Sequence, residues 1–456
     1  MHRRRYGLWI AVSSVAILLG VALAAVAIFQ PGLFRTGPAM VTPSHAAEPL
    51  PGPVLAAAAP NSTPLSADAL RQLLEPLVTN SVLGKSVRVS VVDLGSGQTL
   101  YERDPTVRVV PASNAKVITA AAVLATFGPA HRITTRVVAG ANPGEVVLVG
   151  AGDATLSIDG NAYYEGAGRL DDLAAQVKTA LGGTRPSRLI IDGSLYQGPL
   201  LGPVWDPGAP QEGYVSNITA LMVNGARVDP KDRQSPFERH PDPELAAGNA
   251  FAQLLGGVEV VRGTAPAGAA ELGSVKSAPV IRQLETMLGE SDNTLAESLA
   301  RQVAVAQGKV ASFEGAGDAL NAVLAQLGLP ADQFDMVDGS GYSKLNQLSP
   351  RVLTGLLSKA ATDPRLTDLF NLMPIAGWSG SMDYRFAKPE ALPGLGVVRA
   401  KSGTLNGVNS ITGVVQTADG HLIGFSILAE KVPTWQYPAQ DALDRIVAKI
   451  ATCGCP

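Results

Sequence analysis

A serine and a lysine stand three positions apart at the start of the apolar stretch VPASNAKVITAAAVL, residues 110–124. If this stretch is helical, Ser113 and Lys116 share one face, with their Cβ atoms about 5–6 Å apart. The lysine amine could then take the proton of the serine hydroxyl, provided that burial keeps the amine partly uncharged. The pair alone is weak evidence, because a capping serine followed by a solvated lysine has the same spacing.

Two further short motifs follow this pair along the chain. The sequence ESDNTLAESLAR contains Ser-Asp-Asn at 291–293, and VVRAKSGTLNGVNSITG contains Lys-Ser-Gly-Thr at 401–404. The patterns Ser-x-x-Lys, Ser-x-Asn and Lys-(Ser/Thr)-Gly each occur once, in this order. The trio is the signature of penicillin-binding proteins and class A β-lactamases. Three single matches in this order favour a catalytic interpretation of Ser113 over a structural one.

The chemistry of acyl transfer gives the catalytic members of the trio their expected roles. Ser113 is the candidate nucleophile and Lys116 its general base. Ser291 can relay a proton between Lys116 and a leaving amine. The backbone N–H groups of Ser113 and Thr404 are the expected oxyanion hole.

The remaining motif residues suit substrate binding. Asn293 can form a hydrogen bond with a substrate amide. Lys401 adds positive potential, which disfavours protonation of the nearby base and attracts a carboxylate. The hydroxyls of Ser402 and Thr404 can bind that carboxylate, and Gly403 separates them on a strand along which a peptide could lie.

The sequence predicts that helices and β-hairpins position these residues. Apolar spacing predicts helices at 66–80, 113–127 and 438–452. Alternating valines and turn residues predict β-hairpins at 86–104 and 410–430. We therefore expect one discontinuous domain, 67–139 and 281–456, built on an antiparallel sheet. Residues 140–280, with short valine and leucine runs among glycines and prolines, predict a mainly β inserted subdomain.

The N-terminus predicts export of the chain. Arginines at 3–5 precede an uncharged stretch from Gly7 to Phe29. At about 1.5 Å per residue this stretch can cross a hydrocarbon core of roughly 30 Å. Residues 1–30 are therefore a membrane anchor or a cleaved signal sequence, and both place the body outside the cytoplasm. Residues 31–66, rich in proline and alanine, are expected to form a linker.

Composition excludes several function classes. The chain has 456 residues, a net charge of −3 and 5% aromatic residues, so neither charge nor base stacking favours nucleic acid. The five histidines have no metal-ligand spacing, and the two cysteines, Cys453 and Cys455, do not form a disulfide scaffold. We expect no bound metal.

Over roughly residues 67–450 the sequence resembles the low-molecular-mass penicillin-binding proteins of the D-Ala-D-Ala carboxypeptidase/endopeptidase class, peptidase family S13, penicillin-binding protein 4 type. The segments that carry the resemblance are SDNTLAE (291–297), DGSGYSKLNQLSP (338–350), LMPIAGWSGSMDYRF (372–386), AKSGTLNGVNSITG (400–413) and VGAGDATL (149–156). The third motif departs from the family by having Ser402 where threonine is usual.

The resemblance implies an α/β (α+β) fold of the penicillin-binding-protein and β-lactamase type, in which helices flank an antiparallel sheet. It also implies the reaction. Ser113 attacks the carbonyl of a peptidoglycan stem peptide that ends in D-Ala-D-Ala, and water releases the acyl-enzyme without a cofactor. β-Lactams would acylate Ser113 stably. Asp153 is a candidate for binding a cationic group of the substrate side chain, or else caps the turn that follows it.

Alternatives remain open at this point. A β-lactamase is disfavoured because no glutamate is followed four positions later by asparagine. A Ser-His-Asp esterase is disfavoured because G-x-S-x-G is absent. A cell-wall-binding protein that has kept the fold without turnover is the non-catalytic alternative. The sequence leaves open the balance of carboxypeptidase and endopeptidase activity and the third stem-peptide residue.

Overall fold

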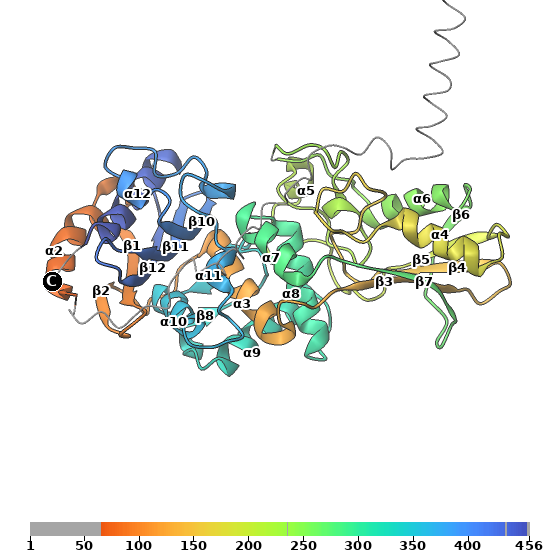
Figure 1. Ribbon diagram of the computed structural model, residues 1–456, viewed down its shortest axis with the longest axis horizontal. Coiled ribbons are helices and arrows are strands. Elements are labelled where there is room, and N and C mark those ends of the chain that lie inside the picture. The colour runs from red at the N-terminus through yellow and green to blue at the C-terminus, as the bar shows by residue number, and fades with distance from the viewer. Residues whose placement is uncertain (1–64, 235, 434–435, 454–456) are drawn as a thin grey trace, which may run out of the picture. The chain divides into compact units, whose positions relative to one another are not determined.

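The computed structural model describes residues 65–456 except 235, 434–435 and 454–456 (Figure 1). The expected anchor or signal at 1–30, and the linker up to residue 64, lie outside these residues. Within the described part of the chain, no helix combines the length and the hydropathy that spanning a membrane requires.

The first sheet joins the two ends of the described chain. Its strand order is β10-β11-β12-β1-β2, and all neighbours are antiparallel. The strands are β1 (Ser86–Asp93), β2 (Thr99–Arg103), β10 (Val398–Leu405), β11 (Val408–Gln416) and β12 (Leu422–Glu430). Both predicted hairpins are present, and the pairing of β1 with β12 links them, from Ser86 opposite Glu430 to Asp93 opposite Ile423.

Helices cover both faces of this sheet (Figure 1). Val87, Val89 and Val91 of β1 share a core with α2 (Ala67–Val78) and α12 (Gln436–Ala451). Side chains alternate along a strand, so Ser90 points the other way, where it lies 2.8 Å from Thr354 Oγ1 of α10 (Pro350–Ala360).

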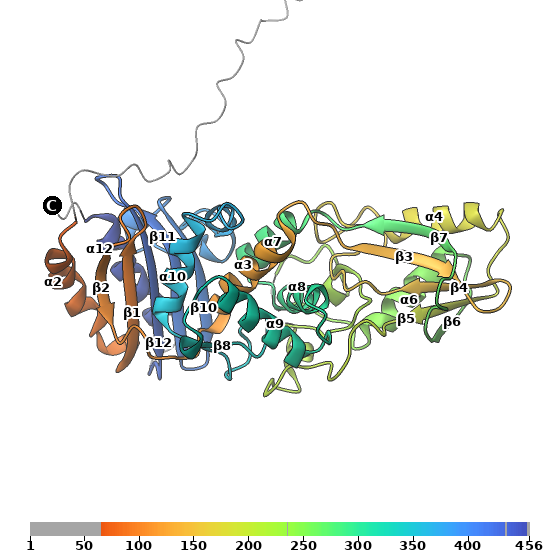
Figure 2. The ribbon, with the colours of Figure 1, turned by 90° about the horizontal axis from the view of Figure 1, so that it is seen from below.

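A cluster of helices beside the sheet surrounds α3 (Ala115–Phe127), which packs against α7 (Val280–Gly289), α8 (Asn293–Ala306) and α9 (Phe313–Gln326) (Figure 2). Every residue of α3 from Ala115 to Leu124 is buried. The helix is apolar nearly all round, as expected for one enclosed by neighbours. Lys116, near its start, is therefore enclosed as well.

The inserted segment forms a second sheet with order β6-β5-β4-β3-β7. Its strands are β3 (Thr134–Ala139), β4 (Glu145–Val149), β5 (Arg188–Asp192), β6 (Glu259–Arg262) and β7 (Glu271–Lys276). The pairs β4-β5 and β5-β6 are parallel, and α4 (Leu170–Ala180) and α6 (Pro243–Leu254) make the crossovers that parallel strands require. The strands expected here are present, but two helices accompany them, and β3 lies before the expected boundary at residue 140.

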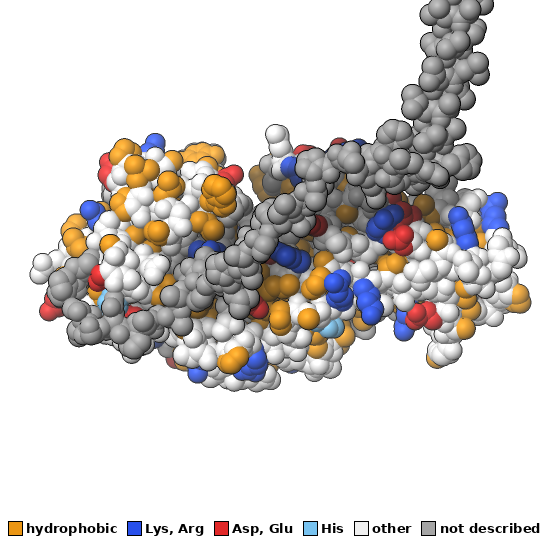
Figure 3. Space-filling view, viewed as in Figure 1, with side chains coloured by type: hydrophobic (Ala, Val, Ile, Leu, Met, Phe, Trp, Pro, Cys, Tyr) orange, Lys and Arg blue, Asp and Glu red, His pale blue; other side chains and the backbone are white. Residues whose placement is uncertain are grey.

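Short elements complete the described chain. They are α5 (Ala209–Glu212), α11 (Leu369–Leu372), β8 (Phe334–Asp335), β9 (Gln347–Leu348) and the 3₁₀ turns η1 (Ser81–Leu83), η2 (Ala112–Asn114), η3 (Asn224–Ala226), η4 (Ala331–Gln333), η5 (Gly380–Met382) and η6 (Leu392–Gly394). Acidic and basic side chains both occur over the face shown in Figure 3, in keeping with the small net charge of −3.

Candidate active site

Ser113 lies in η2, the 3₁₀ turn that leads directly into α3. Ala112, just before it, has φ of 49°, a left-handed conformation that costs a non-glycine residue about 1–3 kcal/mol unless its surroundings hold it. Two contacts hold it here: the Asn114 amide donates to Ser410 Oγ of β11, and Ser410 Oγ donates to the Pro111 carbonyl at 2.7 Å. The sheet thus fixes Ser113 at a helix start, where free N–H groups favour a developing anion.

Lys116 is fully buried one helical turn after Ser113. Its Nζ lies 3.1 Å from Ser113 Oγ, 2.6 Å from Asn293 Oδ1 and 2.7 Å from the Ser340 carbonyl oxygen. The last two atoms are acceptors, so a neutral amine can donate its two protons to them. Its lone pair is then left for the hydroxyl proton of Ser113. The arrangement orients Lys116 as a base toward Ser113.

Burial lowers the pKa of Lys116 to about 8, although the negative charges of Asp338, Glu297 and Asp292 oppose that shift. Burial also raises the pKa of Glu297 to about 7, with a further contribution from the charge of Asp338. Burial likewise raises the pKa of Asp338. Lys116 is therefore uncharged in an appreciable fraction of molecules near neutral pH.

The third motif lies on β10 beside the nucleophile. Lys401 is fully buried and donates to the Ser402 carbonyl at 2.6 Å. Burial lowers the pKa of Lys401 well below its usual value, and the positive charges of Lys116 and Arg385 lower it further. Gly403 allows β10 to lie close to the backbone of Ser113, because a Cβ at residue 403 would lie 2.9 Å from the Ser113 backbone nitrogen. Only glycine allows this approach.

All three motifs contribute to the wall of one cavity of about 230 Å³. The lining residues are Ser113, Tyr214, Glu290, Ser291, Asn293, Gly341, Tyr342, Tyr384, Lys401, Ser402, Thr404, Leu405 and Gln440. Lys116 lies behind Ser113. In the part of the chain that the structure describes, no three His, Cys, Asp or Glu side chains group as metal ligands.

Asp153 is absent from this lining. Its Oδ1 accepts hydrogen bonds from the Thr155 backbone N–H at 2.8 Å and the Thr155 hydroxyl at 2.6 Å. The carboxyl is buried, and burial raises its pKa to about 6. Of the two expected roles for Asp153, the geometry therefore supports the turn cap and not the substrate contact.

Sequence reasoning did not assign a role to Glu297. Its buried carboxylate accepts hydrogen bonds from the backbone N–H of Gly339 at 3.0 Å and of Ser340 at 2.8 Å. These bonds fix the turn whose Ser340 carbonyl receives Lys116. Asp338 closes the same turn by accepting from the Gly341 N–H at 2.7 Å. Two sequence signals pointed to it: Glu297 closes the segment SDNTLAE that carries the family resemblance, and it lies four residues after Asn293, on the same helical face.

Comparisons with known proteins place the chain in one family. The model of the D-Ala-D-Ala carboxypeptidase 3 (S13) family matches residues 70–237 and 233–450. A carboxypeptidase of Mycobacterium tuberculosis is 38% identical over 400 residues, which cover 86% of this chain and 85% of the relative. Carboxypeptidase DacB of Mycolicibacterium smegmatis is 36% identical over 467 residues, 98% of each chain.

Among solved structures, penicillin binding protein 4 of Haemophilus influenzae superposes with a TM-score of 0.69 at 20% identity, covering 85% of this chain and 98% of that one. This likeness confirms the expected fold class, an antiparallel sheet flanked by helices and interrupted by an insertion. The family match and the two carboxypeptidase relatives extend over most of the sequence. The chain belongs to the D-Ala-D-Ala carboxypeptidase 3 (S13) family.

Proposed function

We propose that this enzyme removes the terminal D-Ala from peptidoglycan stem peptides through an acyl-enzyme on Ser113. One observation carries the assignment of Ser113: a fully buried lysine amine lies 3.1 Å from its hydroxyl, at the wall of a cavity shared by all three motifs. Burial disfavours the charged amine and lowers the pKa of Lys116 to about 8, which makes the uncharged form that a base requires accessible.

Acylation follows from this geometry. Ser113 Oγ attacks the carbonyl carbon of the penultimate D-Ala while its proton passes to neutral Lys116. The N–H groups of Ser113 and Thr404 stabilise the oxyanion of the tetrahedral intermediate. The proton then moves from Lys116, by way of the Ser291 hydroxyl, to the nitrogen of the terminal D-Ala, and the C–N bond breaks. Water, activated in the same manner, attacks the ester carbonyl and frees Ser113.

The substrate carboxylate belongs at the β10 end of the cavity. Burial lowers the pKa of Lys401, but an approaching substrate carboxylate favours the protonated amine, which then provides the positive potential. The hydroxyls of Ser402 and Thr404 donate hydrogen bonds. Gln440 Nε2 donates to Thr404 Oγ1 at 3.2 Å and so holds that hydroxyl in place. On the opposite wall, Asn293 Nδ2 donates to a backbone carbonyl at 3.0 Å, so its amide has a fixed orientation toward the substrate.

β-Lactams mimic the D-Ala-D-Ala end, so they would react with Ser113 in the same way and form a stable covalent ester with it.

A substrate in the cell wall requires the body of the enzyme to lie outside the cytoplasm. We propose that residues 1–30 achieve this, either as a lasting membrane anchor or as a cleaved signal.

The test separates this function from the alternatives. A synthetic stem peptide ending in D-Ala-D-Ala should release one D-Ala per peptide. Ampicillin should form an adduct that mass spectrometry locates on the peptide containing Ser113, and the adduct should persist. Rapid ampicillin turnover without D-Ala release would instead identify a β-lactamase, and absence of both reactions would identify a binding protein.

The rate of acylation should depend on pH through Lys116. Its protonated form cannot accept the serine proton, and its pKa is lowered to about 8 by burial. The second-order rate of labelling by fluorescent penicillin should therefore rise about tenfold per unit below roughly pH 7.5 and level off above roughly pH 8.5. Circular dichroism at each pH checks that the protein stays folded. A rate that falls as pH rises through this range would contradict the assignment of Lys116 as base.

A further inference from the structure

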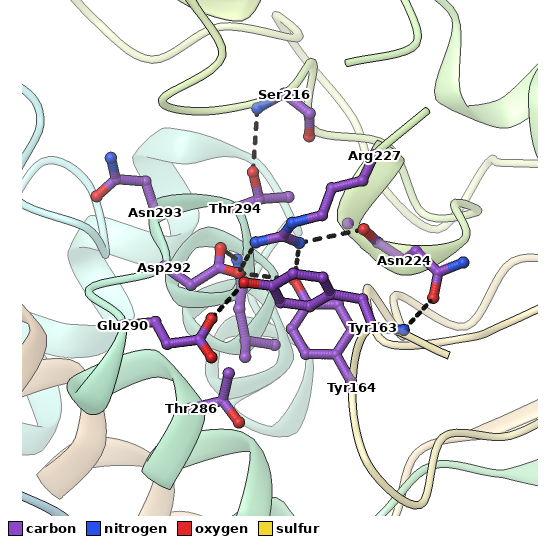
Figure 4. A network of polar contacts seen from close by, with 12 residues as sticks. Tyr163, Tyr164, Ser216, Asn224, Arg227, Thr286, Glu290, Asp292, Asn293 and Thr294 are labelled. Carbon is purple, nitrogen blue, oxygen red and sulfur yellow. Dashed lines mark hydrogen bonds and ion pairs between the residues drawn. The ribbon is translucent and has the colours of Figure 1, made fainter. Parts of the chain in front are cut away.

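The turn that carries Ser291 is held from both sides by the inserted segment (Figure 4). On one side, the Tyr163 hydroxyl donates to Glu290 at 2.6 Å. On the other, Asn293 donates to the Tyr214 carbonyl at 3.0 Å. Ser291 thus lies between two residues that form hydrogen bonds with the inserted segment, which is distant in sequence.

Residues 292 and 294 also form hydrogen bonds with the inserted segment. The backbone N–H of Ser216 donates to Thr294 Oγ1 at 3.0 Å. The Tyr164 hydroxyl donates to Asp292 Oδ2 at 2.7 Å, and Arg227 Nη2 donates to the same oxygen at 2.9 Å. Every described residue from 290 to 294 except Ser291 therefore has a polar contact with residues 163–227. Figure 4 shows those of Glu290, Asp292 and Thr294.

Ser291 itself has a strained backbone. Its φ is 60°, in the left-handed region that non-glycine residues rarely occupy. Such a conformation is unfavourable and persists only where the surroundings over-determine it. The contacts on both sides of Ser291 provide that constraint. Without them we expect the turn to relax and to move the hydroxyl from its place on the wall of the cavity that Ser113 also lines.

Asp292 connects the start of α8 to the inserted segment through both of its carboxylate oxygens. Its Oδ1 caps α8 by accepting from the Leu295 N–H at 3.0 Å, while Oδ2 receives Arg227. Both charged side chains are 1% exposed. Burial alone would raise the pKa of Asp292, but Arg227 and then Arg239 hold it well below its usual range. The carboxylate therefore stays charged and ties the start of α8 to the insertion.

Arg227 is fixed more firmly than an ion pair alone requires. Its Nη1 donates to the Tyr164 hydroxyl at 2.7 Å and to the Asn224 carbonyl at 3.1 Å. Its guanidinium carbon lies 3.6 Å from the centre of the Tyr163 ring and 4.3 Å from that of Phe237. A planar guanidinium can form all these contacts at once, whereas an ammonium cannot.

We propose that Arg227 is a positioning residue for the reaction. Through Asp292 it holds Ser291 in the strained conformation that lets the hydroxyl relay a proton, so the inserted segment completes the catalytic site. This inference rests on the proposed function of Ser113, Lys116 and Ser291. It assigns Arg227 no contact with the substrate.

The direct test measures acylation by fluorescent penicillin in Arg227→Lys, which keeps the charge but loses the planar fork. We expect the first-order acylation rate to fall about 10- to 100-fold, because small displacements of reacting groups cost this much, with little change in the half-saturating concentration. Tyr164→Phe removes only one hydroxyl and should slow acylation about 3-fold. It provides the measurement if Arg227→Lys does not fold.

A double-mutant cycle separates positioning from general stability. In a Ser291→Ala background the relay is already absent, so Arg227→Lys should slow acylation by less than about 3-fold. The matched control is Arg262→Lys, which alters an exposed pair with Asp242 in the same inserted segment and should acylate like the parent.

Two results would overturn the inference. One is a parental acylation rate in folded Arg227→Lys, or in Tyr164→Phe where that variant is decisive. The other is a slowing of the same size in the Ser291→Ala background. A failure of the proposed function itself would be recognised separately, because Ser113→Ala would then still be labelled.

Discussion

Ser113→Ala is expected to abolish covalent labelling by fluorescent penicillin and to lower kcat for D-Ala release by at least about 10⁴-fold. The alanine side chain has no oxygen to form the ester, and removing a nucleophile typically leaves only the catalysis that binding and the oxyanion hole supply. The fold should survive, because Ser113 is only partly buried and its side chain donates no structural hydrogen bond that we observe to the described residues. The melting temperature should therefore stay within a few degrees of the parent.

Two controls make this result specific. Ser96→Ala changes an exposed serine in the turn between β1 and β2 and should label like the parent. Substrate binding should persist in Ser113→Ala, since Lys401 and Thr404 remain to hold the carboxylate. If Ser113→Ala is labelled as strongly as the parent, the nucleophile is another residue, and mass spectrometry of the adduct would identify it.

The sequence predicted the parts of the fold that local patterns determine. The hairpins at 86–104 and 410–430 and the helices at 66–80, 113–127 and 438–452 all appear, with ends shifted by a few residues. Their signals are periodicity, caps and turn residues, all of which act over a few positions. The sequence also predicted that the hairpins at 86–104 and 410–430 belong to one sheet, because each lies next to an amphipathic helix.

The inserted segment was harder to predict. Its short valine and leucine runs do form strands, but β3, TTRVVA, was assigned to the first domain because nothing local distinguishes a strand of one sheet from a strand of another. Helices α4 and α6 were missed. In α6, alanine and glycine in PELAAGNAFAQL weaken the apolar stripe. In α4, LDDLAAQVKTA has a clear stripe of Leu170, Leu173 and Val177, which was overlooked among the short strand-like runs around it. The parallel pairing that these helices allow is a tertiary property.

In the candidate site, the motifs were predictable and their supports were not. Ser113, Lys116, Ser291, Asn293 and Lys401 were found by type and order. The structure places four of them on the wall of one cavity and Lys116 within hydrogen-bond distance of Ser113. The supports are long-range pairs, such as Glu297 with the turn at 339–340 and Arg227 with Asp292. No periodicity joins residues so far apart, and without coordinates a buried arginine cannot be told from an exposed one.

Lys116→Met is expected to lower the rate of acylation about 10³-fold while leaving Ser113 in place. Methionine fills nearly the same volume as lysine in a fully buried site, so the helix should keep its packing, although the acceptors Asn293 Oδ1 and the Ser340 carbonyl lose their donor and the protein should be less stable. It offers no lone pair basic enough to take the serine proton, and general base catalysis contributes about 10²–10⁴-fold to such reactions. The residual labelling should lose the inflection in its pH profile near the Lys116 pKa of about 8.

The lost inflection distinguishes a base from a packing residue. If Lys116 only filled space or held Asn293, Lys116→Met would slow acylation by a similar factor at every pH and keep the parental profile. Lys388→Met, a change at an exposed lysine, should leave both rate and profile unaltered. Acylation within tenfold of the parent, or an inflection that survives the substitution, would contradict the mechanism.

Burial of Lys116 is what makes a lysine usable as this base. With the usual pKa of 10.5 only about 0.03% of amines would be neutral at pH 7, whereas a pKa of about 8 leaves roughly 9% neutral. The enclosure of α3 by α7, α8 and α9 therefore increases the available base roughly 300-fold. The apolar sequence of α3 is typical of a core helix. Its burial nevertheless has a catalytic consequence, because it desolvates the Lys116 amine beside the Ser113 hydroxyl.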